Sequence, residues 1–276
     1  MSPKLAHDLL DQAVTRLGDI GADLIGLQEV DDGQSRSSDL SQISAMAKSL
    51  GAVDWAYAPT VIGTPGEKWR ALNKGDVDLR IGAHTSDHAS YGIGLISKIP
   101  VTKWHKLDLG RSLIGLPLAI PGGGASGDAG GDAGGDGDTE SISDKKKSSI
   151  RFIYVRDEPR VALAAELENG YTVVVTHLSF VPFVNYFQLM KIRRWVANLP
   201  GIHIIMGDLN LGWGLPVRGT HWRTLVVKNS YPSWNPKIQF DYITAHIPHF
   251  GERNLHPLDL PDLGVSDHLP IGVEIN

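Results

Sequence analysis

Several apolar runs of the sequence end abruptly in polar residues that could do chemistry. They are Glu29 in LIGLQEV, His177 in VVVTHLS, Asp208 and Asn210 in IIMGDLN, and Asp267 and His268 in VSDHLP. Strand ends are where a rigid scaffold presents functional side chains. Carboxylates, an amide and two histidines, each following a different buried run, could therefore converge on one point.

This combination suits the hydrolysis of phosphate esters. Mg²⁺ prefers oxygen ligands and takes one or two carboxylates together with water and substrate oxygens. A further carboxylate can orient or deprotonate the attacking water. Amides and histidines can donate hydrogen bonds to a phosphoryl group whose charge is changing. The set predicts a hydrolase that uses Mg²⁺ or Mn²⁺.

Alternating helical and strand patterns must position these residues. We expect helices over residues 5–17, 40–50 and 185–199. We expect strands over residues 24–27, 91–97, 161–167, 171–176, 202–206, 240–245 and 271–275. Asn169-Gly170 favours a hairpin between two of them. The mixture predicts two packed sheets flanked by helices.

Composition excludes several kinds of protein. The 276 residues include no cysteine, which excludes disulfides, thiolate metal sites and cysteine nucleophiles. No apolar run reaches the roughly 20 residues of a membrane span. The net charge of -5 argues against a protein that holds nucleic acid by a bulk positive field.

One segment, residues 121–149, differs from the rest in composition. It is rich in glycine and carries six acidic residues and three lysines, so most of the net negative charge belongs to it. We expect a disordered insertion in a single domain of residues 1–276. Its GGD repeats lack the apolar residue that a calcium-binding β-roll requires.

The ordered set of motifs resembles the endonuclease/exonuclease/phosphatase superfamily, which has the DNase I-like fold. The matching segments are LIGLQEV, YGIGLISKIPV, EPRVALAAEL, VVVTHLS, IIMGDLN, FDYITA and SDHLPI, and they span nearly the whole chain outside the insertion. The resemblance implies an α/β protein (α+β) built as a four-layer α/β/β/α sandwich with two packed mixed β-sheets.

The resemblance also implies a role for each site residue. Glu29 corresponds to the metal-binding glutamate, and Asp208 to the general base or the residue that positions the water. Asn210 corresponds to the asparagine that orients the phosphate or that aspartate. His268 corresponds to the histidine that binds the scissile phosphate, with Asp267 as its carboxylate companion and a metal contact.

Three further positions are weaker candidates on the same resemblance. His177 matches a phosphate-contacting or acid-assisting histidine. Arg160 of the EPR segment is a candidate substrate contact, although a structural ion pair explains it equally well. Trp213, just after GDLN, is a candidate stacking contact, although most tryptophans are packing residues.

The start of the chain departs from the family pattern. Members usually open with a strand of the form T-x-N-I, whose asparagine assists the metal-binding glutamate, whereas here a helix follows Met1-Ser2-Pro3 directly. Asn73 and Asn185 are not placed to replace that asparagine. We expect this form to be less stable and less active than one with a longer N-terminus.

The remaining histidines carry no comparable motif. His84 and His88 have the spacing of a zinc site on a helix, but their surroundings predict a loop without a third ligand. His203 lies in an expected strand, where a structural role is the ordinary interpretation. His221, His246, His249 and His256 have no motif context.

The sequence thus predicts a metal-dependent phosphoesterase acting on a phosphate-ester substrate. A nuclease or phosphodiesterase is the leading interpretation, with nucleic acid as a partner. An inositol-phosphate or lipid phosphoesterase is the alternative, although no segment resembles a membrane anchor. The alternative from a different functional class, binding rather than catalysis, is a catalytically impaired paralogue that only binds a phosphorylated ligand. We expect a monomer, by default in the cytoplasm because no signal peptide is recognisable.

Overall fold

The computed structural model describes residues 3–82, 88–121 and 150–276. The chain divides into two compact units, one formed by Met1–Ser112 with Glu158–Asn276 and the other by Leu113–Asp157. All the predicted site residues belong to the first unit. The predicted insertion falls, apart from Pro121, outside the described residues, so its disorder stays a prediction.

The first unit combines helices with strands. The helices are α1 (Pro3–Ile20), α2 (Gln42–Ser49), α3 (Val184–Val196) and α4 (Ile247–Phe250), with a 3₁₀ turn at Ser35–Ser37. The strands are β1 (Leu24–Asp32), β2 (Asp54–Gly63), β3 (Trp69–Ala71), β4 (Arg80–Ile81), β5 (Ser90–Ser97), β6 (Val101–Gly110), β9 (Arg160–Leu167), β10 (Tyr171–His177), β11 (Ile202–Asp208), β12 (Trp222–Thr224), β13 (Asp241–His246), β14 (Leu255–Pro257) and β15 (Val273–Ile275).

Two sheets form the centre of this unit. The first sheet has the order β1-β5-β2-β3, with β4 also paired to β2, and its pairs are antiparallel. The second sheet has the order β12-β13-β11-β10-β9-β6. In the second sheet β10 and β11 run parallel, because α3 carries the chain back between them, and the other pairs are antiparallel. Strands β14 and β15 form a separate antiparallel pair.

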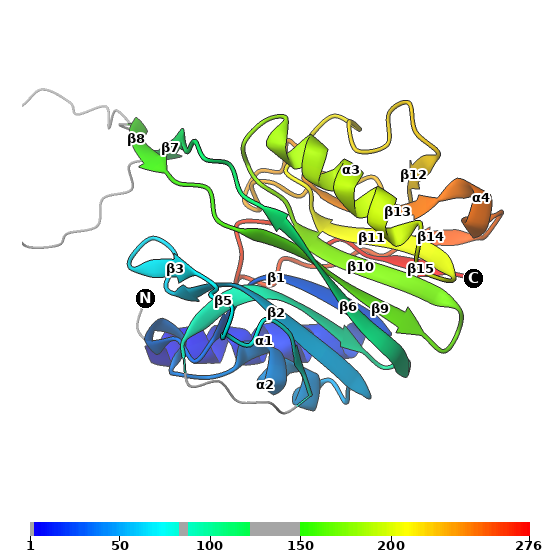
Figure 1. The fold of residues 1–276 in the computed structure, drawn as a ribbon. Coiled ribbons are helices and arrows are strands. Elements are labelled where there is room, and N and C mark those ends of the chain that lie inside the picture. Colours follow the sequence, from blue (N-terminus) through cyan, green and yellow to red (C-terminus); the bar gives the residue numbers. More distant parts are fainter. Residues whose placement is uncertain (1–2, 83–87, 122–149) are drawn as a thin grey trace, which may run out of the picture. The chain divides into compact units, whose positions relative to one another are not determined.

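Apolar side chains hold four layers together. Between the sheets, Leu95 of the first packs with Leu163 and Val175 of the second. The outer face of the first sheet is covered by α1 and α2, and the outer face of the second by α3 (Figure 1). Ile43 of α2 and Leu189 of α3 are fully buried in these outer layers. The order α/β/β/α is therefore the predicted sandwich.

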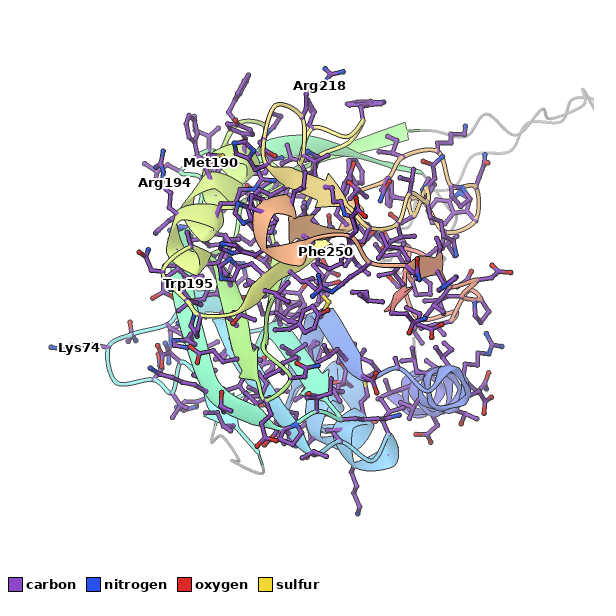
Figure 2. The ribbon with its side chains drawn as sticks, turned by 90° about the vertical axis from the view of Figure 1, so that its right-hand side faces the viewer. Lys74, Met190, Arg194, Trp195, Arg218 and Phe250 are labelled. Atoms are coloured by element: carbon purple, nitrogen blue, oxygen red, sulfur yellow. The ribbon has the colours of Figure 1, made fainter. Side chains whose placement is uncertain are left out.

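The short helix α4 contributes a side chain to the core between the sheets. Phe250 of α4 is fully buried and belongs to the core between the sheets. Figure 2 shows Phe250 beneath α4 and Lys74 at the tip of the loop that follows β3. Among the described residues, no helix is long and apolar enough to cross a membrane.

Most predicted elements coincide with observed ones, but two long strands were not predicted. In β2, Pro59 interrupts the expected pattern, yet it lies where the register with β5 shifts. Strand β6 follows Pro100 at once and mixes polar with apolar residues, because it lies at one end of the second sheet. Strands β2 and β6 are therefore recognisable only from the neighbouring strands with which they pair.

The described residues of the second unit form a strand pair. Strand β7 (Leu116–Pro121) pairs antiparallel with β8 (Ile150–Val155), with Leu116 opposite Val155.

The backbone at Gly207, next to Asp208, requires glycine. Its φ is 132°, and a Cβ there would fall against the carbonyl oxygen of Thr176 on the neighbouring strand. We expect Gly207→Ala to lower the free energy of unfolding by at least about 2 kcal/mol, measured by urea denaturation.

Gly75→Ala is the matched control, because a Cβ at Gly75 meets no atom within 4 Å. Equal stability of the two variants would show that the β11 backbone relaxes at no cost and would contradict the prediction.

Candidate active site

The predicted residues converge at one end of the second sheet. In the strand register, His177 lies opposite Asp208, and Asp208 lies opposite Asp241 on the next strand. Nε2 of His177 is 3.5 Å from Oδ2 of Asp208. Nε2 of His268, on the loop before β15, is 4.0 Å from the same oxygen. Three neighbouring strands and one loop thus meet around the carboxylate of Asp208.

The carboxylate of Asp208 is held in place by the turn that follows β11. The backbone N–H of Asn210 donates to Oδ1 of Asp208 at 2.8 Å. Asn210 has a left-handed φ of 49°, and its Nδ2 donates to the carbonyl of Leu178 at 3.0 Å. The buried Asn185 of α3 donates from Nδ2 to the carbonyl of Asn210 at 2.8 Å. This network leaves Oδ2 of Asp208 facing the two histidines.

Glu29 reaches the site from the first sheet through a bulge in β1. The register with β5 shifts between Leu27 and Val30, and Glu29 has a φ of 58°. Bulges of this kind re-aim a side chain next to an active site. Oε1 of Glu29 lies 3.9 Å from Nδ1 of His177, and 62% of its side chain is exposed. An accessible carboxylate therefore stands beside the buried cluster.

His268 is oriented by a carboxylate and by an aromatic ring. Its Nδ1 is hydrogen-bonded to Oδ2 of Asp241 at 2.7 Å. The ring of Tyr231 lies against the imidazole, with centroids 4.9 Å apart. Ser230 links the two segments, because its Oγ accepts from the N–H of Asp241 and its carbonyl accepts from the N–H of Leu269.

The prediction that Asp267 is the carboxylate companion of His268 is wrong. Asp241 makes that hydrogen bond, whereas the side chain of Asp267 is exposed. The physical reason is that both residues lie in a bend before β15 that turns Asp267 to the surface and His268 inward, so a neighbour in sequence is not a partner in space. A metal contact for Asp267 stays a prediction.

The two central groups have displaced pKa values. Burial, together with the nearby charge of Asp241, raises the pKa of Asp208 to about 7. Burial disfavours the imidazolium of His268, but the hydrogen bond and charge of Asp241 outweigh it and raise the pKa of His268 to about 9. At neutral pH the site therefore holds a carboxylate that can accept a proton beside an imidazolium that can donate one.

His177 is electrostatically different from His268. Complete burial, and then the charge of Arg160, place the pKa of His177 well below 6.5. Its ring is therefore neutral at pH 7 and can donate a hydrogen bond without adding a charge. Burial and the charge of Glu29 also raise the pKa of Tyr91, so this phenol stays protonated.

The two weaker candidates, Arg160 and Trp213, differ in how deeply they are buried. Arg160, the first residue of β9, is 7% exposed, and its charge opposes protonation of both His177 and Asp208. It also lines a cavity of about 490 Å³ bounded by Thr60, Asn73, Lys74 and Lys106. Trp213 is 79% exposed, in the loop that leaves Asn210. Arg160 is thus part of the buried site, and Trp213 belongs to the exposed loop next to it.

Sequence reasoning missed three supporting residues. Asp241 is the second residue of the FDYITA segment and the first residue of β13, Asn185 was considered only as a substitute for the missing first-strand asparagine, and Tyr231 lacks any motif. The first could have been found from its position, because an acidic residue at the start of a buried strand needs a partner. The other two carry no signal in the sequence.

The donor set suits a hard divalent cation. Glu29 offers an exposed carboxylate, and the crowding of Asp208 and Asp241 in a buried site is the kind of repulsion that a dication relieves. Oxygen ligands favour Mg²⁺ or Mn²⁺ over softer ions.

Comparison with known proteins identifies the family of the chain. The model of the endonuclease/exonuclease/phosphatase family matches residues 3–268. The chain belongs to this family. The predicted membership and DNase I-like fold are thereby confirmed, and the family's members are phosphoesterases that typically depend on a metal.

Solved structures of low identity share the fold. A family protein from Leptotrichia buccalis C-1013-b aligns with a TM-score of 0.54 at 12% identity, covering 98% of this chain and 93% of that one. TDP2 of D. rerio, humanized by 14 mutations, aligns at 0.51 and 13%, covering 98% and 93%. A family protein from Bacteroides thetaiotaomicron aligns at 0.51 and 10%, covering 95% and 89%. The comparison with curated proteins gave no match.

The pairing of His268 with Asp241 makes a pKa prediction. In metal-free protein, Asp241→Asn should lower the pKa of His268 from about 9 towards 6.5, because it removes the hydrogen-bonded charge. The titration is measured from imidazole chemical shifts by NMR. Asp267→Asn should lower it less, and a larger drop in that variant would contradict the assignment.

The ion pair of His268 with Asp241 should also make the stability of the fold depend on pH in a defined direction. The folded pKa of His268 lies above its ordinary 6.5, so the ion pair stabilises the fold fully below that pH and is lost as the pH rises through about 9. The stability difference between the natural chain and Asp241→Asn should therefore shrink over this window.

Proposed function

We propose that the chain is a metal-dependent phosphodiesterase of nuclease type, in which Asp208 activates the attacking water. The observation that carries the proposal is the convergence of His177 and His268 on Oδ2 of Asp208, while Oδ1 is held by the N–H of Asn210. One oxygen is fixed and the other faces the two histidines. This is the arrangement a general base requires.

Each side chain of the site has a separate role in the proposed reaction. Asp208 accepts the proton of the water, since its raised pKa of about 7 matches neutral pH. His268, kept charged by Asp241, offers a proton and a positive charge to the phosphoryl oxygens. His177 donates a neutral hydrogen bond, and Asn210 orients Asp208 or the phosphate.

Glu29, with Asp267 as a second contact, would hold the metal ion. When bound, Mg²⁺ or Mn²⁺ supplies a positive charge that stabilises the developing negative charge on the phosphate. The exposed side chains of Glu29 and Asp267 suit this role, because a cation that keeps its waters and binds substrate needs open ligands.

Exposed aromatic side chains next to the site support an extended substrate. Trp213 follows the turn after Asp208, and Trp234 (68% exposed) is in the loop where Ser233 binds the carbonyl of Asp267. Phe183 is 77% exposed at the start of α3, which begins at the same end of the sheet. Such rings can stack on bases of a single strand. They favour a nucleic acid or another aromatic phosphodiester.

A multiply phosphorylated small molecule is less well supported. The basic residues of the neighbouring cavity are balanced by acids, since Lys106 is paired with Asp78 at 3.2 Å and Asp108 at 2.7 Å. A site for an inositol polyphosphate would need uncompensated positive charge. Measurable turnover of a phosphodiester would distinguish an active enzyme from an impaired paralogue that only binds ligand.

Substitution of the proposed base and acid tests the reaction. Asp208→Asn and His268→Gln should each lower kcat by about a hundredfold or more, because each removes a group that acts in the transition state. Hydrolysis of a bis-aryl phosphodiester is measured with Mg²⁺, with Mn²⁺ and with EDTA, which should abolish it. His256→Gln, an exposed histidine on β14, is the control. No turnover by the natural chain in either metal would favour the binding-only alternative.

The substrate class is tested with a panel of single-stranded DNA, duplex DNA, RNA, inositol phosphate and the same aryl diester. Single strands should be cleaved best. Trp213→Ala should raise KM for them by roughly tenfold, because one stacked base contributes about 1–3 kcal/mol. An unchanged KM, or preference for inositol phosphate, would contradict the assignment of Trp213 and of the substrate class.

A further inference from the structure

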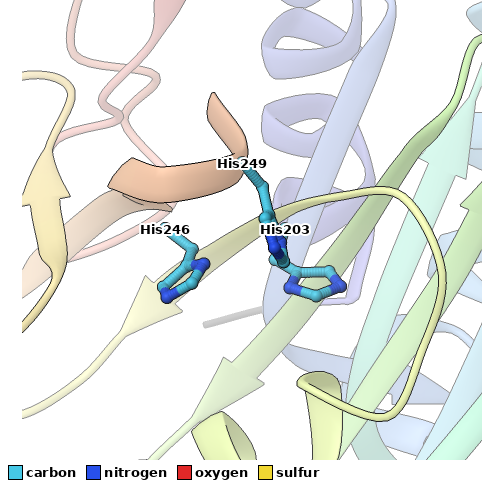
Figure 3. Close-up of side chains that lie close together, drawn as sticks. All are labelled: His203, His246 and His249. Atoms are coloured by element: carbon cyan, nitrogen blue, oxygen red, sulfur yellow. The ribbon is translucent and has the colours of Figure 1, made fainter. Parts of the chain in front are cut away.

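A cluster of three histidines lies at the other end of the second sheet from the proposed active site. His203 is the second residue of β11, His246 is the last residue of β13, and His249 is on α4 (Figure 3). One ring nitrogen from each lies within 4.8 Å of the others. We propose that these three imidazoles bind one divalent transition-metal ion of the Zn²⁺ class.

The cluster is separate from the proposed active site. His203 and Asp208 are five positions apart on β11, a distance of about 17 Å along an extended strand. The two residues also lie on opposite faces of the sheet. His203 shares the face of Ile205, which packs under α3, whereas Asp208 shares the face of Ile204, which packs against the first sheet.

The first supporting observation is the hydrogen bond that orients His203. Its Nε2 lies 2.9 Å from the carbonyl of Leu199, just after α3, and the side chain is almost completely buried. A carbonyl oxygen can only accept, so Nε2 carries the proton and Nδ1 presents a lone pair. Metal-binding histidines are usually fixed in this way, with the second nitrogen donating to a carbonyl or carboxylate.

The second observation is independent and concerns His246. Its Nδ1 is buried and has no hydrogen-bond partner. The ring is held by the indole of Trp222, with centroids 5.4 Å apart, and lies 4.9 Å from the ring of His249. A buried ring nitrogen without a partner is expensive unless it has a ligand. A metal ion would supply one.

The charge state of the histidines suits a metal. Burial and the positive charge of the other histidines lower the pKa values of His203 and His246 below 6.5. The neutral form that this favours is the form in which imidazole binds a metal. Arg193 and His221 add to this effect on His246.

The ligand type selects the class of ion. Neutral imidazoles suit Zn²⁺ and its neighbours, whereas Mg²⁺ and Ca²⁺ require oxygen donors. Around a tetrahedral zinc the ligand nitrogens would be roughly 3.3 Å apart, so the cluster must close slightly. His249 is exposed on a short helix and can make that adjustment by rotating its side chain.

The test is zinc binding by the purified 276-residue chain, stripped with EDTA, in competition with a chromophoric chelator. A large excess of Mg²⁺ is present to occupy the carboxylate site. The natural chain should retain one equivalent of zinc. His246→Ala and His249→Ala should each weaken binding by about a hundredfold, whereas His256→Ala should not change it. Asp208→Asn should also retain the zinc, which separates this site from the proposed active site.

Two further measurements, the absorption of bound Co²⁺ and the melting temperature with zinc, test the same site. Co²⁺ in place of zinc should give the visible absorption of a tetrahedral site, and His249→Ala should lose it. Zinc should raise the melting temperature of the natural chain but not that of His249→Ala, whose exposed position leaves the fold intact without metal. Unchanged zinc affinity in His249→Ala, or displacement of the zinc by Mg²⁺, would overturn the proposal.

Discussion

The backbone register of β10, β11 and β13 is the constraint on which the site depends. Hydrogen bonds between these strands place His177, Asp208 and Asp241 side by side at one level of the sheet. A slip of one residue would turn each of these side chains to the opposite face. Gly207 protects the register, because its unusual backbone allows the two parallel strands to approach at the point where the site begins.

The burial that positions these residues also gives them their chemistry. Asp208 is almost fully buried beside a second carboxylate, so its proton affinity rises to the range where a base works at neutral pH. The same second carboxylate keeps His268 charged. One acidic residue, Asp241, therefore moves the pKa values of both partners upward, in a site that a dication would complete.

The same strand pair carries the second proposed site at its other end. The antiparallel register that sets Asp208 opposite Asp241 also sets Ile204 opposite Ala245, and His203 and His246 come next to that pair. Alternation along the strands sends the two groups to opposite faces, towards the first sheet and towards α3. A hard oxygen site and a nitrogen site can thus coexist on two strands without sharing a ligand.

Local patterns in the amino-acid sequence were enough to predict the family, the layers of the fold and most of the residues that meet at the site. LIGLQEV, IIMGDLN and SDHLPI are contiguous, and a strand followed by a polar turn is encoded within a few residues. The partner of His268 and the histidine cluster depended on tertiary structure. Asp241 is 27 residues from His268, and His203 is brought to His246 only by strand pairing. Contacts across a sheet leave no local pattern, because register is decided by the packing of whole strands.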